Sequence, residues 1–164
     1  MGAVSGARNV LEVGHYYGLS TCAMVLALQA AGHEWKLTTV DAHIPDAWVG
    51  RIAPIASFEA NRLAHFDDDR VTAVFDRSEN ITSIDADFVF YDGDHGEEQL
   101  RFTRLVMESP SVKRFLFDDR DFTWPKQCCE ELRAAGWKDL SPELLRQGGD
   151  KTIANTQTIG WFER

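Results

Sequence analysis

The stretch NVLEVGHYYGLS, residues 9–20, predicts a strand, a glycine-containing turn and the start of a helix. Asn9–Val13 is a short apolar run that ends at Gly14, where the backbone can turn sharply. The next apolar segment, Leu19–Ala31, is typical of a helix, and Gly32 ends it. A strand, a tight turn and a helix in this order form the first part of a βαβ unit, which builds parallel sheets.

The same alternation of short apolar runs and amphipathic segments continues along the chain. Further strands are predicted at 35–40, 70–75, 87–91 and 114–117, and further helices at 53–65, 97–108 and 125–135. Only a polar, glycine-containing segment separates the last two strands, 137–140 and 156–162, so we expect them to be antiparallel. The prediction is one domain over 1–164, an α/β Rossmann-like three-layer sandwich. Its mostly parallel seven-stranded sheet is built from five βα units and a C-terminal antiparallel hairpin.

Composition narrows the classes of function. A chain of 164 residues with 44% apolar residues can bury a core without disulfides or metal staples. Its net charge of −9 and the lack of a basic stripe argue against nucleic acid as a partner. The sequence contains no run of about 18 apolar residues, so we expect no membrane partner. The N-terminus does not resemble a signal peptide, and three cysteines are a poor disulfide framework, so we expect a cytoplasmic protein.

Acidic residues lie at, or directly after, the ends of the predicted parallel strands. They are Glu12, Asp41, Asp76, Asp92, Asp94, Asp118 and Asp119. The carboxyl ends of parallel strands meet at one edge of the sheet, which is where open α/β sheets bind ligands. Helix capping can explain any single acid. The whole set would repel one another unless cations or hydroxyl donors share the site, so the pattern indicates a functional edge.

The loop from Glu12 to Gly18 favours one adenosine cofactor over another. A nicotinamide dinucleotide site needs Gly-x-Gly-x-x-Gly to admit a pyrophosphate, and here Tyr16 replaces the middle glycine. Glu12 would repel a pyrophosphate but suits the ammonium or sulfonium charge of S-adenosylmethionine (SAM). Asp41 suits the ribose hydroxyls of either cofactor. A plain tight turn is the alternative for this loop.

Together these motifs resemble the class I SAM-dependent methyltransferases, and most closely the small-molecule O-methyltransferases of family 24, akin to the macrocin and sugar O-methyltransferases. The resemblance rests on Glu12-x-Gly14-x-x-x-Gly18-x-Ser20, Val40-Asp41, FVFYDGDH at 88–95 and Phe117-Asp118-Asp119. It implies that Gly14 and its neighbours hold the methionine, that Asp41 holds the ribose, and that the residues after the third strand lie beside the adenine. The predicted cofactor-binding set is Glu12, Gly14, Tyr16, Gly18, Ser20, Asp41, Asp76, Arg77, Ser78 and Asp92.

The resemblance also implies a metal ion and a general base. In metal-dependent relatives one Asp after the fourth strand and two acids after the fifth hold magnesium, and Asp92, Asp118 and Asp119 match these positions. Three carboxylates leave room for waters and two substrate hydroxyls in an octahedral shell. His95 is the expected general base, and Asp94 is the rival base. A solvated loop with local ion pairs is the alternative for the two acids after the fifth strand.

The expected function is magnesium-assisted methyl transfer from SAM to an oxygen of a small hydroxylated acceptor. The alternatives are a SAM- or nucleoside-binding module with reduced catalysis, an NAD(P)-dependent reductase, and a hydrolase acting on a phosphorylated substrate. Related enzymes carry helices before the first strand that cover the cofactor, whereas the first predicted strand here starts at Asn9. Either the site is therefore open, or a homodimer partner completes it, or catalysis is reduced.

Overall fold

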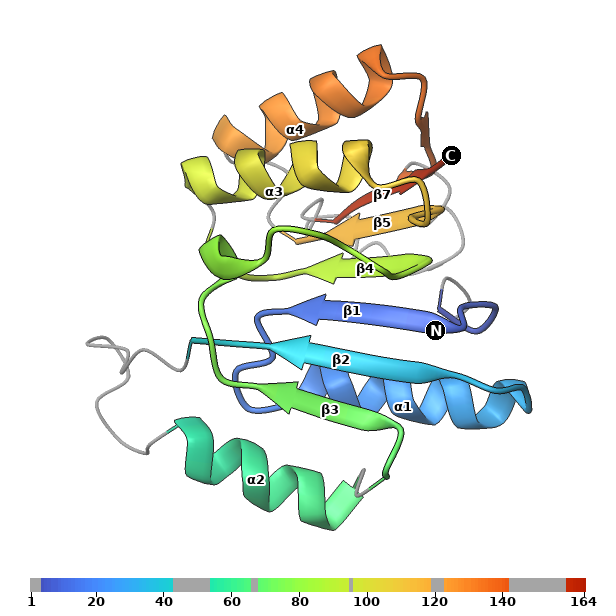
Figure 1. Cartoon of the computed structure of the whole chain (residues 1–164), viewed down its shortest axis with the longest axis vertical. Helices are drawn as coiled ribbons and strands as arrows, with labels where there is room; N and C mark the ends of the chain where they lie inside the picture. Colours follow the sequence, from blue (N-terminus) through green and yellow to red (C-terminus); the bar gives the residue numbers. More distant parts are fainter. Residues whose placement is uncertain (1–3, 43–53, 66–67, 95, 119–122, 142–158) are drawn as a thin grey trace, which may run out of the picture.

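A seven-stranded sheet with the strand order β3-β2-β1-β4-β5-β7-β6 forms the centre of the molecule (Figure 1). The computed structural model describes residues 4–42, 54–65, 68–94, 96–118, 123–141 and 159–164. The strands are β1 Asn9–Val13, β2 Lys36–Val40, β3 Val71–Val74, β4 Phe88–Tyr91, β5 Arg114–Phe117, β6 Lys138–Asp139 and β7 Gly160–Glu163. The helices are α1 Leu19–Ala31, α2 Pro54–His65, α3 Glu97–Glu108 and α4 Thr123–Ala134, with a short 3₁₀ turn, η1, at Ser78–Asn80.

Two hydrophobic cores lie on the two faces of this sheet. One core joins β1, β2, β4, β5 and β7 to α3 and α4, with Tyr91, Phe115 and Phe117 fully buried. The other joins the opposite face to α1 and to Phe58 of α2. In Figure 1, α3 and α4 lie side by side near β5 and β7, and α1 lies behind β2. The predicted three-layer α/β sandwich is confirmed.

The register of the parallel strands brings their carboxyl ends to one level. Val13 at the end of β1 pairs with Val40 of β2 and with Tyr91 of β4, and Tyr91 pairs with Phe117 of β5. The residues that follow these strand ends therefore lie along a single edge of the sheet. The predicted ligand site at the carboxyl ends of the strands requires this placement.

Most predicted elements are confirmed, with small shifts at their ends. β1, α1, α3 and β5 have the predicted bounds. The C-terminal pair is antiparallel as expected, and β7 lies between β5 and β6. The described part of β7 starts at Gly160, and residues 156–158 of the predicted strand lie outside the described residues.

The prediction of five βα units is wrong, because β3 is followed by η1 and not by an α-helix. The Asp76 carboxylate accepts the backbone N–H of Arg77 at 2.8 Å and the side-chain amide of Asn80 at 2.6 Å. Such local side-chain bonds compete with helix formation. The crossover from β3 to β4 is therefore an irregular segment with one 3₁₀ turn. Among the described residues, no helix is both long enough and apolar enough to cross a membrane.

The antiparallel pairing of β7 with β5 predicts a sensitive position at Gly160. Gly160 pairs with Phe117, and a Cβ added to it would lie 2.4 Å from the Phe117 ring. We expect Gly160→Ala to lower the free energy of unfolding by about 1–3 kcal/mol, as overpacking a core does. Urea denaturation measures this change. The matched control is Gly6→Ala, whose Cβ would find its nearest atom at 3.5 Å, and an equal loss in both variants would contradict the packing argument.

Candidate functional site

A cleft of about 420 Å³ opens at the edge of the sheet where the parallel strands end. It is lined by Val13, Gly14, Tyr16, Val40, Asp41, Ala42, Asp76, Arg77, Ser78, Glu79, Asp92, Gly93 and Asp94. Its walls come from the ends of β1, β2 and β4 and from the segment after β3. Seven of the ten residues predicted to bind the cofactor therefore line one cavity.

Gly14 brings the end of β1 against the end of β4. It has a φ of +88°, and a Cβ at this position would lie 2.1 Å from the carbonyl oxygen of Asp92. The backbone on both sides is also bonded: the Gly14 N–H donates to the Val40 carbonyl at 2.8 Å, and the Asp92 N–H donates to the Val13 carbonyl at 2.7 Å. Only glycine fits here, and its lack of a side chain allows a ligand to approach the peptide groups closely.

The loop after Gly14 is tied to the end of β2 by Asp41. Tyr16 adopts a φ of 44°, which is uncommon for a residue with a side chain, and its N–H donates to Asp41 Oδ2 at 2.7 Å. The Tyr16 hydroxyl donates to the Tyr17 hydroxyl at 3.1 Å. The tyrosine that replaces the middle glycine of a dinucleotide motif thus lies at the cleft, with its backbone fixed by the predicted ribose-binding carboxylate.

Tyr16 also borders a second, smaller pocket of about 280 Å³ beside the cleft. Gly14, Tyr16 and Asp92 line both cavities, and His15, Tyr17, Leu19 and Ser20 complete the smaller one. Tyr16 therefore stands where the two cavities meet.

Asp76, Arg77 and Ser78 form the wall that, by the family resemblance, is expected to lie beside the adenine. Asp76 and Arg77 are exposed and Ser78 is half-buried. The hydrogen bonds from Asn80 and from the backbone of Arg77 lower the pKa of Asp76. All three predicted residues line the cleft, and Glu79 beside them was missed.

Glu12 lies behind the lining of the cleft and is fully buried. Its carboxylate accepts hydrogen bonds from the hydroxyls of Ser20 and Thr21, each at 2.6 Å, and of Thr39 at 2.7 Å. Burial raises the pKa of Glu12 to about 7, although the three hydroxyl donors lower it; the charge of Asp92 raises it further. Glu12 therefore supports the glycine loop from below. Gly18, also buried, is the N-cap residue of α1.

Thr21 and Thr39 are site residues that the sequence reading missed. Thr39 pairs with Glu12 in the register of β1 and β2, so aligning the two strands would have found it. The Thr39 hydroxyl gives its one proton to Glu12, so Nδ1 of His15 is the donor in their 2.7 Å bond. The His15 ring stacks on Phe58 of α2, with 4.0 Å between centroids. This chain of contacts fixes the loop from inside.

The predicted metal ligands and general bases are only partly described. Asp92 and Asp94 line the cleft, and Asp118 directly follows β5, with its N–H donating to the Tyr91 carbonyl at 3.1 Å. His95 and Asp119 lie outside the described residues. Within the ranges that the structure describes, no group of three His, Cys, Asp or Glu side chains could hold a metal ion. The metal site and the His95 base stay predictions.

The sheet order and the strand-edge cleft define a Rossmann-like methyltransferase fold, and solved structures share it. An S-adenosylhomocysteine-bound methyltransferase from Podospora anserina, PaMTH1, matches with a TM-score of 0.63 and 14% identity over 96% of this chain and 71% of that chain. An O-methyltransferase family protein from Burkholderia thailandensis matches with a TM-score of 0.62 and 16% identity over 100% of this chain and 53% of that chain. The SAM-dependent methyltransferase SibL matches with a TM-score of 0.59 and 16% identity, covering 98% and 51%.

This chain therefore spans between about half and about 70% of the length of these structures. The comparison with curated proteins gave no significant match. A family model described as a methyltransferase domain matches residues 11–111, which is more than half of the chain. The chain belongs to this methyltransferase family, and the resemblance drawn from the sequence is confirmed.

The burial of Glu12 predicts a pH-dependent stability. Its pKa rises from 4.5 to about 7 on folding, so the protonated form is favoured in the folded state. The stabilisation from Glu12 is therefore complete below about pH 4.5 and is lost as the pH rises towards 7. We expect the unfolding free energy of the wild type, minus that of Glu12→Gln, to fall by up to about 3 kcal/mol across this window. Urea titrations from pH 4.5 to 7.5 measure it; a flat difference would contradict the burial argument.

Proposed function

We propose that the strand-edge cleft binds SAM and that the chain transfers its methyl group to a hydroxyl oxygen of a small acceptor. The observation that carries this proposal is the lining of the cleft. A peptide backbone opened by Gly14, the carboxylate of Asp41 and the polar segment at Ser78 line one cavity, and these are the groups expected to hold methionine, ribose and adenine. The fold shared with an S-adenosylhomocysteine-bound methyltransferase and with an O-methyltransferase family protein supports it.

Several physical features fit this cofactor. A cavity of about 420 Å³ falls within the range of small-molecule sites. The Asp41 carboxylate can accept hydrogen bonds from ribose hydroxyls. Asp92, Asp94 and the Glu12 carboxylate behind them give the methionine side of the cleft a negative potential, which favours a sulfonium and an ammonium group. The same potential opposes a pyrophosphate, so it disfavours a dinucleotide.

In methyl transfer the protein contributes mainly by orienting the cofactor and the acceptor. The acceptor oxygen forms a bond to the methyl carbon while the carbon–sulfur bond breaks, and S-adenosylhomocysteine leaves with the electron pair. Holding the two reactants in line accounts for most of the rate gain in such a displacement. The hydroxyl proton passes to a base at the end of β4. Asp94 lines the cleft there, and His95 follows it in the sequence.

Magnesium assistance belongs to the same proposal. Asp92 and Asp118 follow the ends of neighbouring in-register strands, and Asp119 comes next in the chain. Carboxylate oxygens are the ligands that magnesium prefers. A bound magnesium ion would lower the pKa of the acceptor hydroxyl. The chain's own part would be to hold two neighbouring hydroxyl groups of the acceptor near the methyl group. An acceptor with two adjacent hydroxyls is a diol or a catechol.

Isothermal titration with SAM, S-adenosylhomocysteine and NADH tests the cofactor. We expect both adenosyl ligands to bind in the micromolar range and NADH not to bind. Gly14→Ala should weaken S-adenosylhomocysteine binding at least about tenfold, because its Cβ would displace the backbone of Asp92. Gly6→Ala, which meets nothing closer than 3.5 Å, should bind like the wild type. A folded wild type that binds neither adenosyl ligand would rule out the proposal.

Turnover on a panel of catechols and sugar diols tests the metal. We expect EDTA to lower methyl transfer at least about tenfold and added magnesium to restore it, since the ion acidifies the acceptor hydroxyl. Asp92→Asn and Asp118→Asn should lose the magnesium response. The control Asp85→Asn alters an exposed acid that precedes β4, at the opposite end of the strand. Turnover that EDTA leaves unchanged would exclude magnesium assistance but not the cofactor.

A further inference from the structure

Arg101 of α3 reaches the segment between β3 and β4. Its Nη2 donates to the Ser78 carbonyl at 2.8 Å and its Nη1 donates to the Ile81 carbonyl at 3.3 Å. The two carbonyls belong to the ends of the 3₁₀ turn η1, since the Ile81 N–H itself donates to the Ser78 carbonyl at 3.0 Å. One guanidinium thus holds both ends of η1.

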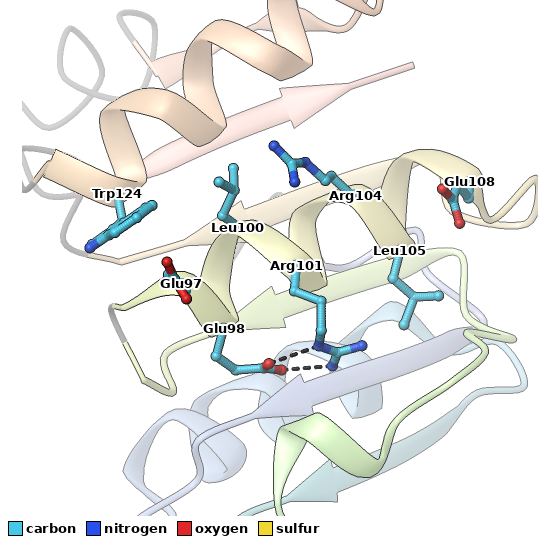
Figure 2. A pocket seen from close by; sticks show the side chains of 8 residues that line it. All are labelled: Glu97, Glu98, Leu100, Arg101, Arg104, Leu105, Glu108 and Trp124. Carbon is cyan, nitrogen blue, oxygen red and sulfur yellow. Dashed lines mark hydrogen bonds and ion pairs between the residues drawn. The ribbon is translucent and has the colours of Figure 1, made fainter.

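Glu98 fixes the guanidinium that does this. It accepts two hydrogen bonds from Arg101, from Nε and from Nη2, each at 2.7 Å. Figure 2 shows this pair on α3, with the two side chains pointing together away from Arg104. A planar guanidinium held by a two-pronged carboxylate has few orientations left, so its remaining donors are well aimed.

The tethered turn is a wall of the proposed cofactor cleft. Ser78 and Glu79 line the cleft, whereas Glu98 and Arg101 line a separate pocket of about 670 Å³ on the outer side of α3. Arg101 therefore contacts the wall from behind and does not line the cleft itself. The Tyr91 hydroxyl, at the end of β4, donates at 3.0 Å to the carbonyl of Asp94, another residue that lines the cleft.

We infer that Arg101, oriented by Glu98, is a positioning residue that sets the affinity of the cleft for the adenosine part of its ligand. The inference rests on the proposed function. The segment from β3 to β4 has no α-helix to hold it, so its backbone depends on bonds from outside the segment. If the wall is already ordered before the ligand binds, binding does not have to order it, and the entropic cost of binding is smaller.

A matched control lies one turn further along α3. Arg104 lines the same outer pocket, but its Nε and Nη2 donate to Glu131 of α4 at 2.9 and 2.7 Å. Both arginines are exposed and each makes a two-pronged ion pair with a glutamate. Removing either one deletes an ion pair between an exposed arginine and a half-buried glutamate. Only Arg101 reaches the wall of the cleft.

The test compares Arg101→Met, Arg101→Lys and Arg104→Met by thermal melting and by titration with S-adenosylhomocysteine and with adenosine. We expect Arg101→Met to raise the Kd for both ligands about tenfold, and Arg104→Met to change it less than about twofold. Arg101→Lys keeps one donor for the Ser78 carbonyl and should recover part of the affinity. The two Met variants should lose similar amounts of melting temperature.

Hydrogen exchange adds a readout that does not need a ligand. Amides at 78–81 should exchange faster in Arg101→Met than in Arg104→Met. Wild-type affinity in Arg101→Met, or equal weakening in both Met variants, would overturn the positioning role while leaving SAM binding intact. A wild type that binds neither ligand would overturn this inference and the proposed function together, which separates the two failures.

Discussion

The contact between the backbones of Gly14 and Asp92 is the constraint on which the cleft depends. A side chain at Gly14 would begin 2.1 Å from the Asp92 carbonyl oxygen, so the loops that follow β1 and β4 can meet only through glycine. The in-register pairing of β1 with β2 then places Asp41 beside this junction, where it accepts the Tyr16 N–H. The cleft therefore follows from the sheet register and one glycine, without any need for a specially shaped core.

Glu12 is the second constraint. At neutral pH its burial lowers the free energy of unfolding, because part of its charge is removed from water. Burying a carboxylate costs free energy even when three hydroxyls solvate it, which is why its pKa rises to about 7. A protein that needed only a stable loop could place an apolar residue there. A buried group that carries part of a negative charge at neutral pH, directly behind a ligand cleft, is typical of a functional site. Its field acts on the cleft through the peptide groups of the glycine loop, where a cationic ligand gains from it.

The fold could be predicted from the sequence to the extent that local signals mark each end. β1 and α1 have their predicted bounds because a glycine follows each of them. The convergence of Asp41, Asp76 and Asp92 on one cleft could also be predicted, since it follows from parallel strand ends alone.

Other features depend on packing that leaves no local signal. The sequence does not show whether a Glu in a strand points to the cleft or into the interior, and Glu12 faces interior hydroxyls of α1 and β2. Arg101 bonds to backbone carbonyls 20 and 23 residues away, and a carbonyl is present at every position of a chain. The count of five βα units was one too high, because the segment after β3 forms no α-helix and its polar side chains bond locally.

The absence of an α-helix between β3 and β4 affects how the cleft is held together. An α-helix satisfies its own carbonyl groups, whereas an irregular crossover must find donors elsewhere. Here the donors come from α3, which follows the opposite wall of the cleft at β4. The wall at Ser78 is therefore bonded to α3, and the chain after β4, where the Tyr91 hydroxyl donates to the Asp94 carbonyl, leads into the same helix. A displacement of α3 would therefore act on both walls, because one wall is bonded to this helix and the other precedes it in the chain.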